Sequence, residues 1–138
     1  MAAGDRGLLI LGAAGAGKSA LALKLIAFGA RLVSDDRVEV TADGERLIAR
    51  CPSEAIRGLI EARGFGILRM EAQDEARLIL AIDLDHTEGA RLPPLRHLTL
   101  LGRPLALAHA ARADHLPYAL WCHLKGAARE LGEDAGSE

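Results

Sequence analysis

Runs of apolar residues separated by short polar segments divide the chain into alternating strands and helices. Leu8–Leu11 is continuously apolar, which is typical of a buried strand. Ala20–Ala27 is apolar apart from one lysine, and it predicts a helix that Gly29 ends. A strand that leads directly into a helix is the building unit of α/β proteins, so this pattern predicts an α/β fold.

The next segments predict a sheet that is not wholly parallel. A short strand is expected over 30–36, and it ends in two carboxylates. Two further strands, 38–41 and 47–50, flank Asp43 and Gly44, a pair of residues that favours a tight hairpin turn. Because hairpin strands are antiparallel, we expect a mixed sheet.

The rest of the chain predicts further strands and one last helix. Ser53 is expected to cap a short helix that reaches about Ile60. Asp114 is expected to cap the last helix, which runs to about Leu131. Between these helices the pattern predicts strands at 67–68, 77–84, 98–101 and 104–107, and a loop at 86–96.

The composition fits one domain, residues 1–132, followed by an acidic tail at 133–138. Half of the residues are hydrophobic, but only four are aromatic, so the core must consist of aliphatic side chains. The net charge of −2 gives no basic field for nucleic acid, and few aromatic rings are present to stack on bases.

The cysteines and the apolar runs indicate the compartment. Cys51 and Cys122 stand alone, without the spacing of a metal or redox site, which is typical of a reducing environment. No signal peptide is recognisable, and no apolar run is long enough to cross a membrane. We therefore expect a soluble, cytoplasmic protein.

Between the first strand and the first helix lies the phosphate-binding pattern G-x-x-x-x-G-K-[ST]. Its glycines let successive N–H groups turn toward an anion, and the helix start adds unpaired donors. Lys18 would reach the terminal phosphates, and Ser19 would offer its hydroxyl to Mg²⁺. The alternative is a glycine-rich turn that binds nothing, but the flanking strand and helix favour a nucleoside triphosphate site. The loop consists of Gly12, Ala13, Ala14, Gly15, Ala16, Gly17, Lys18 and Ser19.

Two adjacent carboxylates, Asp35 and Asp36, are the strongest candidates for the chemistry that follows nucleotide binding. They come at the C-terminal end of a predicted strand, where open α/β sheets bind their ligands. One would join the magnesium shell while the other accepts a proton from an attacking hydroxyl. The alternative is a solvated turn, and the phosphate loop earlier in the same unit favours the functional interpretation.

Asp83 and Arg63 are weaker candidates. Asp83 follows the apolar strand 77–82, as a magnesium-binding aspartate often does, but any strand that leaves a sheet can end in this way. In Glu61–Gly66, glycines stand on both sides of Phe65 and suggest a flexible loop. Arg63 would stabilise charge on a transferring phosphoryl group, or would belong only to a helix end with an exposed salt bridge.

Three segments resemble the HPr kinase/phosphorylase family in its short form, which lacks the N-terminal domain. They are the phosphate loop at 12–19, the sequence LVSDDRVE at 32–39, and LIEARGFGI at 59–67. The last segment is similar to the family's signature pattern L-x-E-x-R-G-x-G-I. All three occur in the family's order between residues 7 and 70, and beyond residue 70 the resemblance is slight.

The resemblance implies a phosphate-loop core related to phosphoenolpyruvate carboxykinase. It also implies an enzyme that uses ATP and Mg²⁺ to phosphorylate a serine of HPr, the phosphocarrier of the bacterial phosphotransferase system. In that family the same site can also remove the phosphate with inorganic phosphate. By position, Asp36 would be the acid/base residue and Arg63 would assist the phosphoryl step. Asp35, with Ser19 and Glu61, would lie on the metal side.

Three departures from the family pattern leave alternatives open. Ala20 stands where the family usually has an acidic residue that assists the metal, and Ala14 stands where relatives have a serine. A strand with a histidine usually precedes the loop strand, whereas only six residues precede Gly7, so we expect an open sheet edge. A nucleotide-binding regulatory module without efficient turnover and a small-molecule kinase remain as alternatives, and homo-oligomerisation is undecided.

Overall fold

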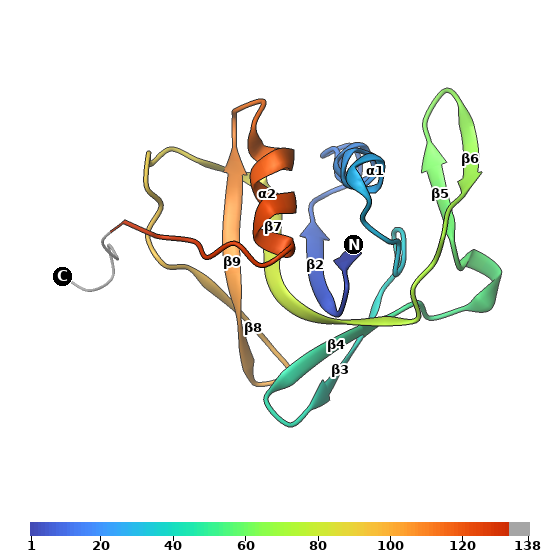
Figure 1. Ribbon diagram of the computed structural model, residues 1–138, viewed down its shortest axis with the longest axis horizontal. Coiled ribbons are helices and arrows are strands. Elements are labelled where there is room, and N and C mark those ends of the chain that lie inside the picture. The colour runs from blue at the N-terminus through green and yellow to red at the C-terminus, as the bar shows by residue number, and fades with distance from the viewer. Residues whose placement is uncertain (133–138) are drawn as a thin grey trace.

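The structure, a computed structural model, describes residues 1–132. In this part of the chain a mixed sheet forms the centre, two α-helices lie against it, and a separate hairpin stands beside them (Figure 1). The predicted α/β fold with a mixed sheet is confirmed, whereas the predicted tail at 133–138 lies outside the described residues. The elements in chain order are β1 Ala2–Ala3, β2 Arg6–Leu11, α1 Lys18–Phe28, β3 Glu39–Asp43, β4 Arg46–Arg50, the 3₁₀ turn Glu54–Ile56, β5 Leu59–Ala62, β6 Gly66–Arg69, β7 Glu75–Glu88, β8 His97–Leu100, β9 Arg103–Ala111 and α2 Leu116–Leu124.

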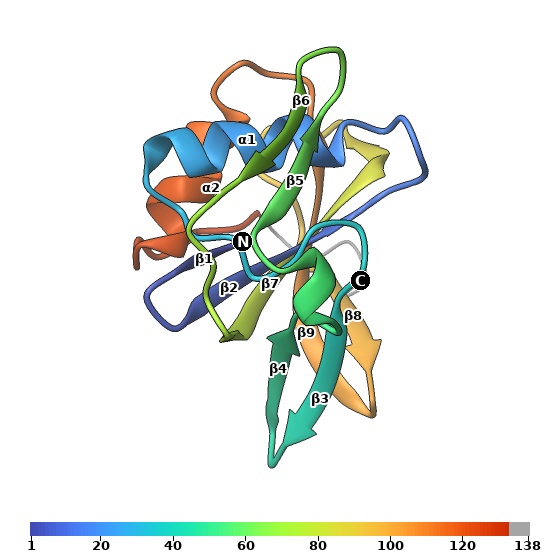
Figure 2. The same cartoon turned by 90° about the vertical axis from the view of Figure 1, so that its right-hand side faces the viewer.

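The 14-residue strand β7 is the centre of the sheet. β2 runs parallel to it along one edge, with Leu11 opposite Asp83. Along the other edge, the start of β7 pairs antiparallel with β4, and its second half pairs parallel with β9. The hairpins β3–β4 and β8–β9 extend side by side away from the helices (Figure 2), and Arg103 Nε donates to the carbonyl of Gly44 at 2.9 Å.

Two hydrophobic clusters, one on each face of the sheet, hold the layers together. Because alternate residues of a strand point to opposite faces, the neighbours Leu8 and Leu9 of β2 belong to different clusters. Full burial of such a side chain stabilises the fold by roughly 1.5–3 kcal/mol. Both helices pack on the first cluster, whose buried members include Leu8, Leu21, Leu25, Leu80, Ile82, Leu120 and Leu124. The second cluster includes Leu9, Leu47, Ala49, Leu78, Ala81 and Leu105.

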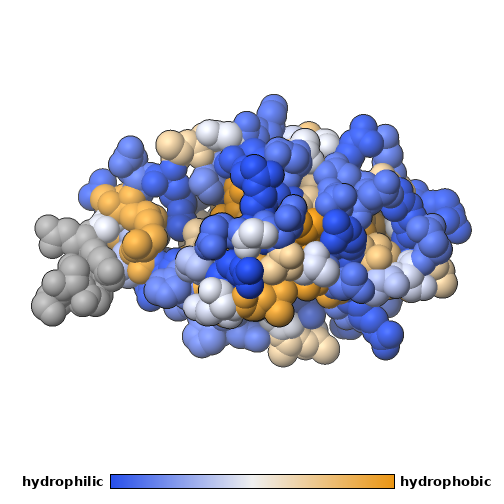
Figure 3. Space-filling view, turned by 90° about the horizontal axis from the view of Figure 1, so that it is seen from below, coloured by the Kyte–Doolittle hydropathy of each residue, from blue (hydrophilic) through white to orange (hydrophobic). Residues whose placement is uncertain are grey.

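Hydrophilic residues cover much of the face seen in Figure 3, with apolar patches between them. Of the large apolar side chains in the described part of the chain, Phe65 and Ile67 are the most exposed, at 83% and 70%. Both belong to the β5–β6 hairpin, which stands apart from the main sheet. No helix within residues 1–132 is long and apolar enough to span a bilayer.

The predicted phosphate-loop strand, its helix and the following hairpin are confirmed. β2 contains the predicted strand 8–11, and α1 contains the predicted helix 20–27. Gly29 ends α1 as expected, and its N–H donates to the carbonyl of Ile26 at 2.9 Å. β3 and β4 pair across a turn in which Gly44 has a φ of 60°.

The helix predicted over 53–60 is wrong. Ser53 does cap a turn with its hydroxyl, but this turn is only the 3₁₀ segment Glu54–Ile56. Gly58 then adopts a φ of 75°, and a Cβ atom there would lie 2.8 Å from the carbonyl oxygen of Met70. The chain can therefore turn only at a glycine, and it continues as strand β5.

The segment 61–66, which the sequence suggested as a flexible loop at a helix end, belongs to a hairpin instead. β5 pairs antiparallel with β6, with Ala62 opposite Gly66. Gly64 lies in the turn with a φ of 83°. The glycines of this segment therefore allow a tight reversal of the chain between two strands.

The predictions for the later strands are partly wrong. β7 continues through residues 85–88 into the predicted loop, and β9 covers nine residues where a strand of only four, 104–107, was expected. The predicted strand at 30–36 is absent from the described fold, where Arg31 and Leu32 form only isolated bridges. Pairing with partners distant in the sequence decides each case, and the local pattern does not reveal such partners.

The last helix is shorter than predicted. Its N-cap is His115 rather than Asp114, and it ends at Leu124, well before Leu131. Gly126 follows with a φ of 122°, and its N–H bonds back to the last turn. A glycine in the left-handed region just after the final turn is a common way to end a helix.

Part of the sheet edge that was expected to be open is covered by β1. Ala2 pairs with Gly7 and Ala3 with Arg6, antiparallel to β2. Met1 is buried, and its amino group donates to the carbonyl of Leu8 at 3.1 Å. The edge of β2 therefore has hydrogen-bond partners at its start.

Glu88, at the end of β7, forms side-chain contacts with the loop at 89–96 that follows it. Its side chain is 7% exposed, forms an ion pair with Arg96 at 3.2 Å and accepts from the Ala90 N–H at 3.1 Å. Burial alone would raise the pKa of Glu88, but the Ala90 N–H, Arg96 and His109 outweigh it and hold the pKa below its usual 4.5. The charged form of Glu88 therefore stabilises the fold.

We expect Glu88→Gln to lower the free energy of unfolding at neutral pH by about 1–3 kcal/mol, because it removes the charge from a largely covered carboxylate that is hydrogen-bonded to Arg96 and Ala90. A carboxyl group whose pKa falls on folding stabilises the protein above its unfolded pKa, and this contribution is lost as the pH falls through its folded pKa. The deficit of the variant should therefore shrink below pH 4.5.

Urea unfolding from neutral pH to about pH 3 measures this effect. Glu45→Gln, at an exposed position in the β3–β4 turn, is the matched control and should behave as the wild type does. Equal stabilities of wild type and Glu88→Gln at neutral pH would contradict the expectation.

Candidate functional site

The phosphate loop connects the end of β2 with the start of α1. Gly15 and Gly17 have φ values of 85° and 99°, which other residues rarely adopt. Gly17 is the N-cap of α1, and no side chain of the described residues caps this helix end. The first N–H groups of the helix, at Lys18 and Ser19, therefore face the loop at the positive end of the helix dipole. This geometry suits an anion such as a phosphate.

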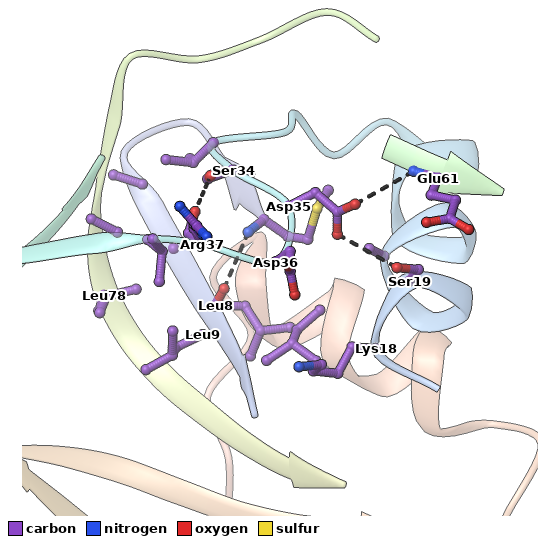
Figure 4. A pocket seen from close by; sticks show the side chains of 18 residues that line it. Leu8, Leu9, Lys18, Ser19, Ser34, Asp35, Asp36, Arg37, Glu61 and Leu78 are labelled. Carbon is purple, nitrogen blue, oxygen red and sulfur yellow. Dashed lines mark hydrogen bonds between the residues drawn. The ribbon is translucent and has the colours of Figure 1, made fainter. Parts of the chain in front are cut away.

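Asp35 and Asp36 lie beside the start of α1. The Asp35 carboxylate accepts from the Ser19 hydroxyl at 3.5 Å and from the backbone N–H of Glu61 at 3.4 Å, so it joins the phosphate loop to the β5–β6 hairpin (Figure 4). Asp36 has a φ of 67°, an uncommon conformation for a residue with a side chain. Strained backbone of this kind is concentrated at active sites.

Two cavities meet at this acidic pair. The first has a volume of about 270 Å³ and is lined by Lys18 and Ser19 together with both carboxylates (Figure 4). The second, of about 500 Å³, adds an apolar wall. That wall consists of Pro52, Ile56, Leu59 and Ile67. The residues common to both cavities are Asp35, Asp36, Arg37 and Glu61. The acidic pair, with Arg37 and Glu61, therefore lies where the two cavities meet.

The structure does not bring every predicted site residue to this point. The glycine part of the loop, 12–17, lines neither of the two cavities. Glu61 lines both, from strand β5. Arg63 lies in the exposed turn of the hairpin and lines neither of these cavities. Arg37 was not singled out from the sequence, but it lines both cavities and adds a positive charge there. Its position directly after the acidic pair was the sequence signal that could have revealed it.

Asp83 lies at the end of the β7 segment that pairs with β2, and its side chain is engaged within its own strand. One carboxylate oxygen accepts from the N–H of Asp85 at 2.9 Å, and the other lies 2.7 Å from Nδ1 of His86. Burial alone would raise the pKa of Asp83, but these two contacts and His109 outweigh it and hold the pKa below its usual 3.8. Asp83 lines neither of the two cavities, so the magnesium role suggested for it has no support in this geometry.

A contact that the sequence analysis missed joins β7 to the phosphate loop. Both carboxylate oxygens of Asp85 lie within hydrogen-bond distance of the Ala13 N–H, at 3.0 and 3.1 Å. The sequence contained one signal, the Asp-Leu-Asp pattern at 83–85, where a second carboxylate follows the first at the end of a strand.

Comparison with known proteins identifies the family. A family model described as "HPr Serine kinase C-terminal domain" matches residues 2–87, more than half of the chain. A curated HPr kinase/phosphorylase from Streptococcus pyogenes serotype M1 is 32% identical over 94% of this chain. Another, from Streptococcus uberis, is 39% identical over 62% of this chain.

The chain spans less than half of these curated relatives, 46% of the first and 30% of the second. Among solved structures, the HPr(Ser) kinase/phosphatase from Coxiella burnetii matches with a TM-score of 0.71 and 27% sequence identity. That match covers 85% of this chain and 84% of the Coxiella chain. The fold, the phosphate loop beside an acidic pair, and the matched family model agree: the chain belongs to the family of HPr serine kinase C-terminal domains.

Proposed function

We propose that the chain transfers the γ-phosphoryl group of ATP to a serine hydroxyl of an HPr-type phosphocarrier protein. The observation that carries the proposal is the presence of Lys18, Ser19 and the Asp35–Asp36 pair on one cavity. A phosphoryl transfer needs a cation on the phosphates and a base for the attacking hydroxyl, and these residues offer both. The names of the relatives support a serine of HPr as the acceptor.

In the proposed reaction Asp36 is the general base. It accepts the proton of the serine hydroxyl while the serine oxygen forms a bond to the γ-phosphorus. The bond between the γ-phosphorus and the bridging oxygen breaks, and ADP leaves. Lys18 compensates the negative charge on the phosphates throughout. With inorganic phosphate as the attacking group, the same site would remove the phosphate from phosphoserine and release pyrophosphate.

Ser19 and Asp35 fit the protein side of a magnesium site. Their side-chain oxygens lie 3.5 Å apart at the start of α1. Within residues 1–132 no group of three His, Cys, Asp or Glu side chains is placed to hold a metal ion alone. Nucleotide-bound Mg²⁺ does not need such a group, because phosphate oxygens and water supply most of its ligands. Mg²⁺ would neutralise charge on the phosphates, and Glu61, which lines both cavities, is the third residue of the proposed metal set.

One observation favours a second candidate, a regulatory module that binds nucleotide without efficient turnover. The first turn of α1 contains no acidic residue, and the exposed Ala20 occupies the position where the family usually has one. The magnesium ion would then depend on Ser19 and Asp35 for its protein ligands. Phosphoryl transfer to a carrier separates the two candidates, because only the enzyme performs it.

Lys18→Ala should weaken ATP binding by about 1 kcal/mol or more, because it removes the cation that faces the terminal phosphates. Isothermal titration calorimetry with ATP and Mg²⁺ measures the change. Lys24→Ala is the matched control, since Lys24 is an exposed lysine further along the same helix. The phosphate-loop interpretation is wrong if Lys18→Ala binds ATP as tightly as the wild type.

Asp36→Asn should reduce the rate of serine phosphorylation by about 10²–10⁴-fold and change ATP affinity little, because it removes a base but no phosphate ligand. Asp35→Asn should instead raise the Mg²⁺ concentration needed for half-maximal activity. The assay is the transfer of label from ATP to a purified HPr-type protein.

Asp43→Asn, at an exposed position at the end of β3, is the control for these two variants and should retain full activity. An Asp36→Asn protein with the normal rate would exclude the base role. A wild-type chain that binds ATP and labels no HPr-type carrier would exclude the kinase proposal in favour of the regulatory module.

A further inference from the structure

Strand β7 has a bulge where it passes the phosphate loop. Along β9, His109 pairs with Asp83 and the next residue, Ala110, pairs with Thr87, so residues 84–86 of β7 have no counterpart on β9. A bulge bends its strand and redirects the side chains within it. The bulge follows directly after the pair Leu11–Asp83, the last pair between β2 and β7.

The bulge lies against the start of the phosphate loop. A Cβ atom built at Gly12 would lie 3.3 Å from the Cβ of Leu84 and 2.9 Å from the Cβ of Ala16, so only glycine fits between strand and loop. The next residue of the bulge is Asp85, and the next residue of the loop is Ala13. The Asp85 carboxylate accepts from the Ala13 N–H at 3.0 and 3.1 Å.

Neighbouring side chains fix the bulge in this shape. Asp83 accepts from the backbone N–H of Asp85 at 2.9 Å, and its other oxygen lies 2.7 Å from the ring of His86. The His86 ring stacks on His109 of β9, with ring centroids 5.1 Å apart. The position of Asp85 is therefore determined by two strands of the sheet and does not depend on the loop itself.

We propose that Asp85 is a positioning residue that holds the phosphate loop in the shape that binds nucleotide. This proposal rests on the proposed function, because it takes the loop to be the ATP site. All five residues from 13 to 17 are alanine or glycine, so this part of the loop has no polar side chain with which to order itself. An external acceptor on the Ala13 N–H reduces the conformational freedom that the loop loses when a phosphate binds.

Asp85 acts through the loop and not on the reacting atoms. It lines neither of the two cavities at the acidic pair, and its carboxylate is engaged with Ala13. Removing it should therefore weaken nucleotide binding and leave the transfer step itself unchanged. A carboxylate that merely stood near the phosphates would have the opposite effect, since its removal would relieve repulsion and tighten binding.

The test compares wild type, Asp85→Ala, Asp85→Asn and the control Asp43→Ala. Calorimetry gives ATP–Mg²⁺ affinity, the carrier assay gives kcat and KM, and NMR hydrogen exchange reports on the Ala13 amide. Asp85→Ala should raise the Kd and the KM for ATP about tenfold, leave kcat near that of the wild type and speed exchange at Ala13. Asp85→Asn keeps one acceptor oxygen, so its losses should be smaller.

Unchanged or tighter ATP binding by a folded Asp85→Ala, or unchanged exchange at Ala13, would overturn the inference. If Asp85→Ala does not fold, the same readouts on Asp85→Asn decide, and wild-type values there count against it. A wild-type chain that binds ATP but labels no carrier would contradict only the proposed kinase activity, because the binding and exchange data still test the role of Asp85. A wild-type chain that binds no ATP defeats both.

Discussion

The parallel pairing of β2 with β7 is the constraint on which the site depends. It brings the carboxyl ends of both strands to the same edge of the sheet, so the loop after Leu11 lies beside the bulge after Asp83. Helix α1 leaves the loop and packs through Leu21 and Leu25 on the same cluster that buries β2 and β7. The orientation of α1 is thus determined by hydrophobic burial and not by the polar residues at its N-terminus.

Asp35 connects the two parts of the candidate site, the phosphate loop and the β5–β6 hairpin. Its carboxylate reaches Ser19 at the start of α1 and the N–H of Glu61 on the separate β5–β6 hairpin. The hairpin contributes the apolar wall of the larger cavity through Leu59 and Ile67. In the proposed reaction, an acceptor protein that contacts this exposed hairpin would therefore be linked to the phosphate loop through a single carboxylate.

Local signals in the sequence predicted the strand and helix that flank Gly12–Ser19 well and the surrounding sheet less well. The strand, loop and helix around Gly12–Ser19 can be predicted from residues close together in the sequence, because the glycine pattern directly follows one apolar run and precedes another. The first half of the hairpin, up to residue 66, was predicted as a helix and its end, whereas the strand predicted at 67–68 lies within β6. The hairpin strands pair only with each other and include few β-branched residues, so the local pattern is weak. The contact of Asp85 with Ala13 joins residues far apart in the sequence and depends on a bulge, which no local pattern reveals.

Carboxylates hold the phosphate loop at both of its ends. Asp85 accepts from Ala13 where the loop leaves β2, and Asp35 accepts from Ser19 where the loop enters α1. The middle of the loop, with Gly15 and Gly17 in left-handed conformations, has no such side-chain partner among the described residues. Fixed ends reduce the entropy that the loop loses on binding. Between them the Ala16 N–H donates to the carbonyl of Ala13 at 3.0 Å, while the N–H groups of Ala14, Gly15 and Gly17 keep their capacity for an anion. Asp85 therefore occupies the N–H of Ala13 and Asp35 the hydroxyl of Ser19, so neither carboxylate competes with an anion for the remaining N–H groups of the loop.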